Sequence, residues 1–143
     1  MSAIICAESE PALVLIAEDE EPLAETVAFA VHEAGYTPLV ALHGRQALEL
    51  ARSRRPALLI LDLMLPYIDG SAIIAALRED ARAGGVMPPI VLMTGASLVQ
   101  ARAVGADVVL RKPFHLADLT QLLHRFLVPV SSSTDVNAGA ANE

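Results

Sequence analysis

Five short aliphatic segments alternate with segments of helical periodicity along this chain. The segments expected as strands cover residues 13–17, 37–41, 57–61, 90–93 and 107–111. Their apolar residues are continuous instead of alternating with polar ones, which is typical of strands buried on both faces of a parallel sheet. Since a helical segment follows every strand, we predict an α/β fold: a doubly wound, five-stranded parallel sheet of (βα)5 order with helices on both faces.

The predicted helices have recognisable ends and apolar faces. They cover residues 22–34, 44–54, 71–80, 98–104 and 116–127. Pro22 suits a first helical turn and Gly35 suits the position just after a last turn, so the two residues delimit the first helix. The expected buried face of this helix has its apolar residues spaced 4, 3 and 4 apart: Leu23, Val27, Ala30 and Ala34.

The composition favours one domain with an aliphatic core. The chain has 143 residues, of which 54% are hydrophobic and only 3% aromatic. Its formal net charge of −7 argues against direct binding of nucleic acid, which needs clustered Lys and Arg. The one basic run, residues 52–55, is expected at the C-terminus of a helix, where cations complement the helix dipole.

Other features favour a cytoplasmic protein without membrane insertion. Cys6 is the only cysteine, so the chain can form neither an internal disulfide nor a Cys-based zinc site. The N-terminal residues lack the basic region of a signal peptide, and no apolar run approaches the ~18 residues of a membrane span. We expect an N-terminal tail over 1–10, one domain over 11–129 and a disordered C-terminal tail over 130–143.

Polar side chains stand directly after four of the five predicted strands. Glu18 and Asp19 follow the first strand, Asp62 the third, Thr94 the fourth, and Lys112 the fifth. The C-terminal ends of parallel strands meet at one edge of the sheet, where open α/β sheets bind their ligands. We therefore expect three carboxylates, a hydroxyl and an ammonium to lie together.

Three neighbouring carboxylates need a cation. Two like charges 4 Å apart repel by about 4 kcal/mol at an effective dielectric constant near 20. Mg²⁺ relieves this repulsion and keeps coordination positions open for phosphate oxygens. Asp62 could then attack a phosphoryl donor as a nucleophile, with Lys112 and Thr94 holding the transferred group. Lys112 is the only lysine in the chain, against nine arginines, which indicates a need for a compact ammonium there.

Neighbouring acidic residues have simpler interpretations. Glu20 and Glu21 are expected as favourable charges at the N-terminus of a helix. Asp69, which precedes Gly70, is expected as a turn or helix-cap residue.

Four segments together resemble the receiver domain of two-component response regulators. They are VLIAEDE (14–20), LLILDLMLPYIDG (58–70), VLMTGAS (91–97) and RKPF (111–114). The resemblance covers roughly residues 13–128, and the combination is specific although each segment alone is a weak signal. It implies a flavodoxin-like fold, a bound Mg²⁺ ion, and phosphorylation by a sensor histidine kinase or a histidine phosphotransfer protein.

The resemblance also implies a role for each site residue. Glu18 and Asp19 match the acidic pair that binds Mg²⁺, and Asp62 matches the phosphoacceptor, which also contacts the metal. Met64 matches the residue whose backbone carbonyl contacts the metal. Thr94 matches the switch hydroxyl. Lys112 matches the lysine that pairs with the phosphoryl group.

The chain departs from the family pattern in two places. The family usually has an aromatic residue three positions before the lysine, where this chain has Val109, so an aromatic rotamer switch cannot operate there. The interval from Thr94 to Lys112 is also shorter than usual. Only residues 96–104 can hold the intervening helix, which is thereby limited to roughly one or two turns. Our hypothesis is that signalling relies on reordering of this helix and its loop.

The leading functional hypothesis is a stand-alone receiver that signals by binding an unidentified output protein. Such a protein phosphorylates and dephosphorylates itself on one aspartate and turns over no separate substrate. An alternative is a phosphorylation-independent binding module that keeps the fold. A haloacid-dehalogenase-type phosphatase is disfavoured, because it needs a second acid two residues after the nucleophile, where this chain has Met64.

Overall fold

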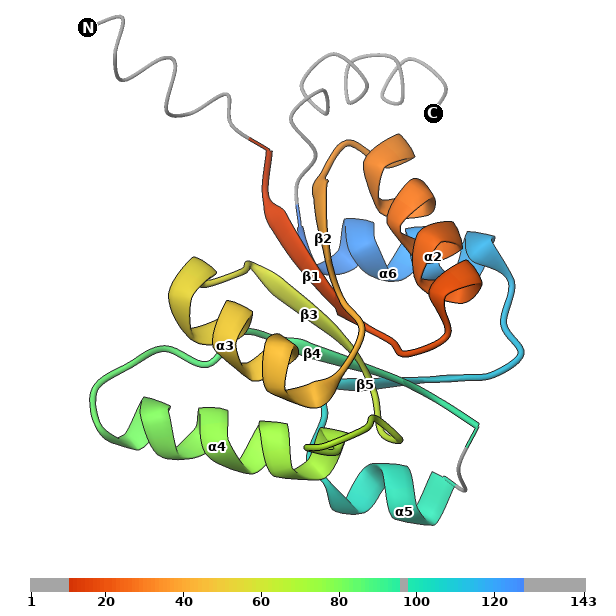
Figure 1. The fold of residues 1–143 in the computed structure, drawn as a ribbon. Coiled ribbons are helices and arrows are strands. Elements are labelled where there is room, and N and C mark those ends of the chain that lie inside the picture. Colours follow the sequence, from red (N-terminus) through yellow and green to blue (C-terminus); the bar gives the residue numbers. More distant parts are fainter. Residues whose placement is uncertain (1–10, 96–97, 128–143) are drawn as a thin grey trace, which may run out of the picture.

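The central feature of the computed structural model, which describes residues 11–95 and 98–127, is one parallel sheet (Figure 1). Its order is β2-β1-β3-β4-β5, so the predicted doubly wound parallel sheet is confirmed. The strands are β1 Leu13–Ala17, β2 Thr37–Ala41, β3 Leu58–Asp62, β4 Ile90–Thr94 and β5 Val108–Arg111. The predicted tails, Cys6 and the last residues of the predicted domain lie outside the described residues.

Helices cover both faces of the sheet (Figure 1). They are α2 Glu21–Glu33, α3 Gly44–Arg54, α4 Gly70–Arg82, α5 Leu98–Ala103 and α6 Leu116–Phe126. Alternate strand residues face opposite layers: Val14 and Ile16 pack with α2 and α6, whereas Leu15 and Ala17 pack on the side of α3, α4 and α5. None of the described helices combines the length and apolar character needed to cross a membrane.

Strands β3 and β4 end one residue later than predicted. Their last residues still pair with a neighbouring strand: Asp62 lies opposite Met93, and Thr94 lies opposite Arg111. Strand β5 begins one residue later than predicted, and Asp107 instead caps the strand beside it, since its carboxylate accepts a hydrogen bond from the Ile90 N–H at 2.7 Å. The polar residues at the strand ends are therefore held in register by the sheet.

The predicted buried face of α2 was wrong by about one residue. Val27 and Ala30 are buried as expected, but Ala24 and Val31 complete the face, while Leu23 and Ala34 are only half-buried. Apolar residues lie on both sides of the buried face as well as within it, so the spacing of apolar residues alone does not show where the centre of the buried face lies. The short helix α5 was anticipated from the spacing of Thr94 and Lys112, and it ends at Ala103.

Asp69 caps α4, in agreement with its predicted role. Its Oδ1 accepts hydrogen bonds of 2.9 Å from the Ala72 N–H and from the Ser71 hydroxyl. These hydrogen bonds, led by the one from Ala72, lower the pKa of Asp69 below its ordinary value of 3.8. The stabilisation is therefore present above pH 3.8 and is lost as the pH falls through the lowered pKa.

Replacing Asp69 with alanine is expected to lower the free energy of unfolding by about 1 kcal/mol at neutral pH, because one helix cap is lost. Asp69→Asn should retain most of the stability, since asparagine caps as well as aspartate. Urea unfolding of the three proteins checks this. Equal stability of the Ala and Asn variants would contradict the assignment of Asp69 as the cap.

Candidate functional site

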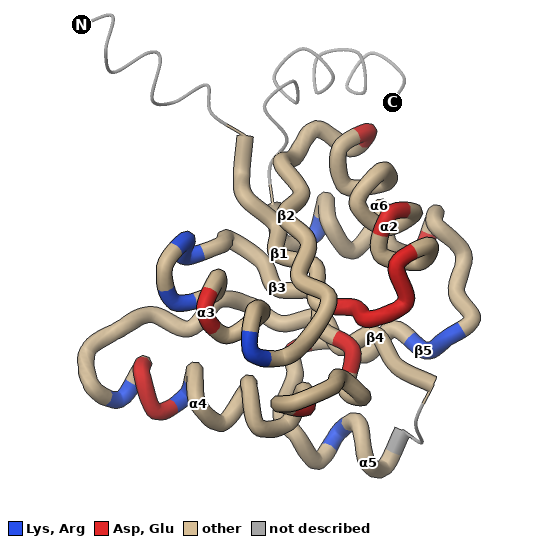
Figure 2. Tube along the Cα trace, viewed as in Figure 1, with Lys and Arg blue, Asp and Glu red and all other residues tan. Residues whose placement is uncertain are grey.

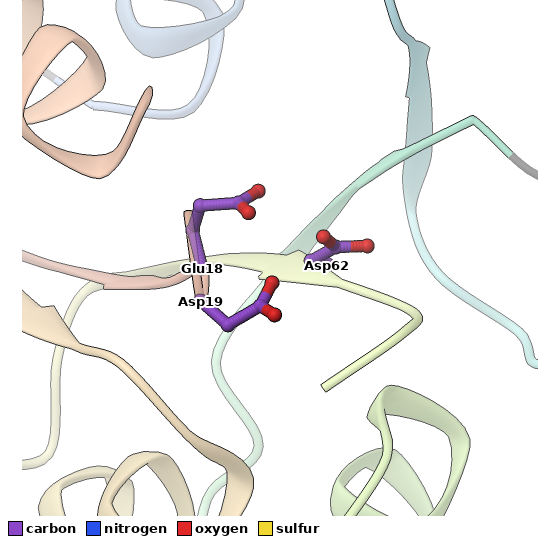
Figure 3. A group of neighbouring side chains, drawn as sticks. All are labelled: Glu18, Asp19 and Asp62. Atoms are coloured by element: carbon purple, nitrogen blue, oxygen red, sulfur yellow. The ribbon is translucent and has the colours of Figure 1, made fainter. Parts of the chain in front are cut away.

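Three carboxylates converge at the C-terminal edge of the sheet (Figure 3). Glu18 and Asp19 follow β1, and Asp62 is the last residue of the adjacent strand β3. One carboxylate oxygen from each lies within 4.8 Å of those of the other two. Glu18 and Asp62 are buried, whereas Asp19 is exposed. The predicted clustering of these residues is confirmed.

The ammonium of Lys112 bridges the two buried carboxylates. Its Nζ donates to Glu18 Oε1 at 2.8 Å and to Asp62 Oδ2 at 2.9 Å. The backbone N–H of Lys112 donates to the Thr94 carbonyl at 2.9 Å. The backbone pairing of β4 with β5 therefore continues as far as Lys112 and fixes the position of its backbone at the edge of the sheet. Figure 2 shows acidic residues from the end of β1 into α2 and basic residues at the end of β5, which the sequence gives as Arg111, the last residue of β5, and Lys112.

The electrostatics of the site show a deficit of positive charge. Burial raises the pKa of Glu18 above its ordinary 4.5, and repulsion from Asp62 adds to this, against hydrogen bonds from Lys112 and the Glu20 N–H. Burial alone would lower the pKa of Lys112, but its hydrogen bonds to Glu18 and Asp62 outweigh burial and raise the pKa above 10.5. The hydrogen bonds between Lys112 and the carboxylates therefore favour the charged form of each group, and burial opposes this on both sides.

Thr94 and Met64 lie beside this cluster. Thr94 is completely buried at the end of β4, the strand that pairs with β3. The Met64 N–H donates to Asp62 Oδ1 at 3.1 Å, while the Met64 side chain is 70% exposed. This contact is made by the Met64 N–H, so the expected metal contact of its backbone carbonyl stays a prediction.

Two backbone features of the site were not predicted from the sequence. The Glu20 N–H donates to Glu18 Oε2 at 3.0 Å, which fixes the buried carboxylate from the side opposite Lys112. At Gly70 a Cβ would lie 2.7 Å from the Asp62 carbonyl oxygen, so a side chain there would displace the end of β3. The Asp69–Gly70 pair is a visible signal for Gly70, but it predicts only a turn or helix cap and not the close approach to Asp62.

The donor set suits a hard divalent cation. Each of the three residues offers an oxygen ligand, and Mg²⁺ prefers carboxylate oxygens. Three carboxylates and one ammonium leave a formal charge of −2, which a divalent ion would neutralise. Glu18, Asp19 and Asp62 therefore fit a magnesium site, with Lys112 placed to share the carboxylates.

Comparison with known proteins agrees with this arrangement. Residues 14–124 match the family model described as the response regulator receiver domain. The chain is 34% identical over 125 residues to the transcriptional regulatory protein TrcR of Mycobacterium tuberculosis, with 85% of this chain and 47% of TrcR covered. It is 36% identical over 116 residues to the transcriptional regulatory protein PcoR of Escherichia coli, with 78% of this chain and 48% of PcoR covered.

Solved structures share the fold. The chemotaxis response regulator CheY4 of Vibrio cholerae matches with a TM-score of 0.72 and 30% identity, over 82% of this chain and 99% of CheY4. The receiver domain of a sensor histidine kinase from Pseudomonas aeruginosa, which has a magnesium ion in its active site cleft, matches with a TM-score of 0.71 and 26% identity, over 81% of this chain and 97% of that domain.

The chain spans about half the length of the curated relatives that it matches. The expectation that it acts without an output domain therefore stays a prediction.

Proposed function

Because this chain belongs to the response regulator receiver domain family, we propose that it accepts a phosphoryl group on Asp62. The observation that carries the proposal is the position of the Asp62 carboxylate, which ends a buried strand between two further carboxylates and the ammonium of Lys112. The donor would be the phosphohistidine of a sensor histidine kinase or of a histidine phosphotransfer protein. The phosphorylated form would then bind an output partner, and no separate substrate would be turned over.

In the proposed step, an Asp62 carboxylate oxygen attacks the phosphorus atom of the donor. The new O–P bond forms as the P–N bond of phosphohistidine breaks, and the electron pair of that bond stays on the imidazole nitrogen. The bond from the Met64 N–H to Oδ1 and the bond from Lys112 to Oδ2 orient the carboxylate before attack. Lys112 then compensates the negative charge on the phosphoryl oxygens, and the hydroxyl of Thr94, which ends the strand paired with β3, would hold one of them.

Glu18, Asp19, Asp62 and the Met64 carbonyl are the proposed holders of Mg²⁺. The ion would neutralise charge on the phosphoryl oxygens, as in other phosphoryl transfers. Lys112 already pairs with two of these carboxylates, so it keeps the site assembled and limits the repulsion among them.

A second candidate function is phosphorylation-independent binding by the same fold. The short helix α5, which is only six residues long, favours it, because little helical surface is left there to rearrange. The two candidates differ in whether Asp62 gains a phosphoryl group.

Incubation with acetyl phosphate and Mg²⁺, followed by intact mass measurement, tests the proposal. The wild type should gain one phosphoryl group, and Asp62→Asn should gain none, because its amide is not a nucleophile. Asp69→Asn is the matched control, since it changes an aspartate in the same loop and keeps the helix cap. A folded wild-type protein that gains no phosphoryl group would support the binding module instead.

A further inference from the structure

Tyr67 adopts an unusual conformation five residues after Asp62. It lies in the loop between β3 and α4 and has a φ of 71°, in the left-handed region that bulky L-residues rarely adopt. Its side chain is 79% exposed, so burial of the ring does not compensate the strain. Other contacts must hold this conformation, and strained residues of this kind often belong to functional loops.

The ring of Tyr67 contacts the beginning of α3 on two sides. The His43 ring meets it edge-on, with the centroids 5.1 Å apart and an interplanar angle of 87°. The guanidinium carbon of Arg45 lies 5.9 Å from the centre of the Tyr67 ring, within the range of a cation–π contact. His43 is itself fixed as the N-cap of α3, where its Nδ1 accepts a hydrogen bond from the Gln46 N–H.

The backbone on both sides of Tyr67 is also packed on α3. The Gly44 N–H donates to the Pro66 carbonyl at 3.0 Å. A Cβ at Gly44 would lie only 1.7 Å from the Ile68 carbonyl oxygen, so this close approach requires glycine. The loop that follows Asp62 is thus held against the first turn of α3 by backbone and by side-chain contacts.

The other end of the same loop is attached to the Asp62 carboxylate. The Met64 N–H donates to Asp62 Oδ1 at 3.1 Å. The two ends of the loop are joined to each other, because the Gly70 N–H donates to the Leu63 carbonyl at 2.8 Å. A change at Oδ1 can therefore be accommodated mainly by the residues between Met64 and Ile68, and Tyr67 is the strained residue among them.

We propose that Tyr67 transmits the state of Asp62 to the surface at the beginning of α3. This inference rests on the proposed phosphorylation of Asp62. An oxygen of an acyl phosphate is a weaker hydrogen-bond acceptor than one of a free carboxylate, so the bond from the Met64 N–H weakens or moves when Asp62 is phosphorylated. The loop then shifts, Tyr67 leaves its strained conformation, and its contacts with His43 and Arg45 change.

The two tyrosines of the chain provide a reporter and an internal control. Tyr36 is buried on the opposite face of the sheet, and its hydroxyl lies 3.0 Å from His124 Nδ1. We would record aromatic NMR spectra of tyrosine-labelled protein before and after treatment with acetyl phosphate and Mg²⁺, and measure the intact mass of the same samples. Tyr67→Phe assigns the two sets of resonances. Phosphorylation should shift the Tyr67 resonances and leave those of Tyr36 nearly unchanged.

Arg45 allows a second measurement on the unphosphorylated protein. Arg45→Ala removes the cation from the ring and should shift the Tyr67 resonances toward their phosphorylated positions, whereas Arg45→Lys keeps a cation and should shift them less. A sample that gains one phosphoryl group while Tyr67 keeps its resonances would overturn this inference and leave the proposed function intact. A wild type that gains no phosphoryl group would overturn both.

Discussion

Replacing Lys112 with alanine is expected to slow phosphorylation of the protein by acetyl phosphate on the order of 100-fold, because the ammonium that compensates charge on the phosphoryl group is lost. Lys112→Arg keeps the charge, but its planar guanidinium cannot replace a compact ammonium between two carboxylates, so labelling should remain slow. Arg111→Ala is the matched control, since it removes the exposed neighbouring cation and should label at the wild-type rate. Labelling time courses by intact mass measure all four proteins.

The same substitution should also destabilise the metal-free fold. Glu18 is fully buried and Asp62 nearly so, and Lys112→Ala leaves both without their cation. Breaking a buried pair in this way costs about 3–5 kcal/mol, and the partial exposure of Lys112 favours the lower end of that range. Because the pKa of Lys112 is raised, the stabilisation is present below pH 10.5 and is lost as the pH rises through the raised pKa. Equal labelling and equal stability of Lys112→Ala and wild type would contradict the proposed role.

The second large effect concerns the affinity for Mg²⁺. Asp19→Asn should weaken Mg²⁺ binding at least ~10-fold. Removing a carboxylate that coordinates the metal is expected to reduce the affinity at least as much as removing a residue that only hydrogen-bonds to such a ligand. Asp19 is exposed and makes little other contribution to the fold, so the variant should remain as stable as wild type. Calorimetric titration with Mg²⁺ measures the affinity.

Glu20→Gln is the matched control for Asp19→Asn. Glu20 lies next to Asp19 and carries the same charge, but it stands at the N-cap of α2 and its side chain makes no cap hydrogen bond. Its removal should change the Mg²⁺ affinity little. Equal losses in the two variants would indicate that Mg²⁺ responds only to the general negative charge after β1.

The position of the site could be predicted because a parallel sheet aligns the ends of its strands. Glu18 follows one aliphatic strand and Asp62 ends the strand beside it, so the two residues meet because of the strand order. Lys112 could be assigned to the same edge for the same reason. The sharing of the Lys112 ammonium between Glu18 and Asp62 could not be predicted, because it depends on side-chain geometry that the spacing of residues does not specify.

The features that were missed depend on contacts between segments that are distant in sequence. The close approach of Gly44 to Ile68 and the left-handed backbone of Tyr67 arise where α3 meets the loop after Asp62. No local pattern marks Tyr67 as strained, because tyrosine is unusual at a positive φ. Val109 is half-buried and packs on the α5 side of the sheet. The hypothesis that signalling relies on reordering of α5 and the loop before it stays a prediction.

The position of the phosphoryl group is the most direct test of the proposed function. Borohydride reduces an aspartyl phosphate to homoserine, which peptide mass mapping can locate. After treatment with acetyl phosphate and Mg²⁺, the reduced protein should contain homoserine at position 62, and protein treated without Mg²⁺ should contain much less. Homoserine at another position, or none in a folded and labelled protein, would contradict the assignment of Asp62 as the phosphoacceptor.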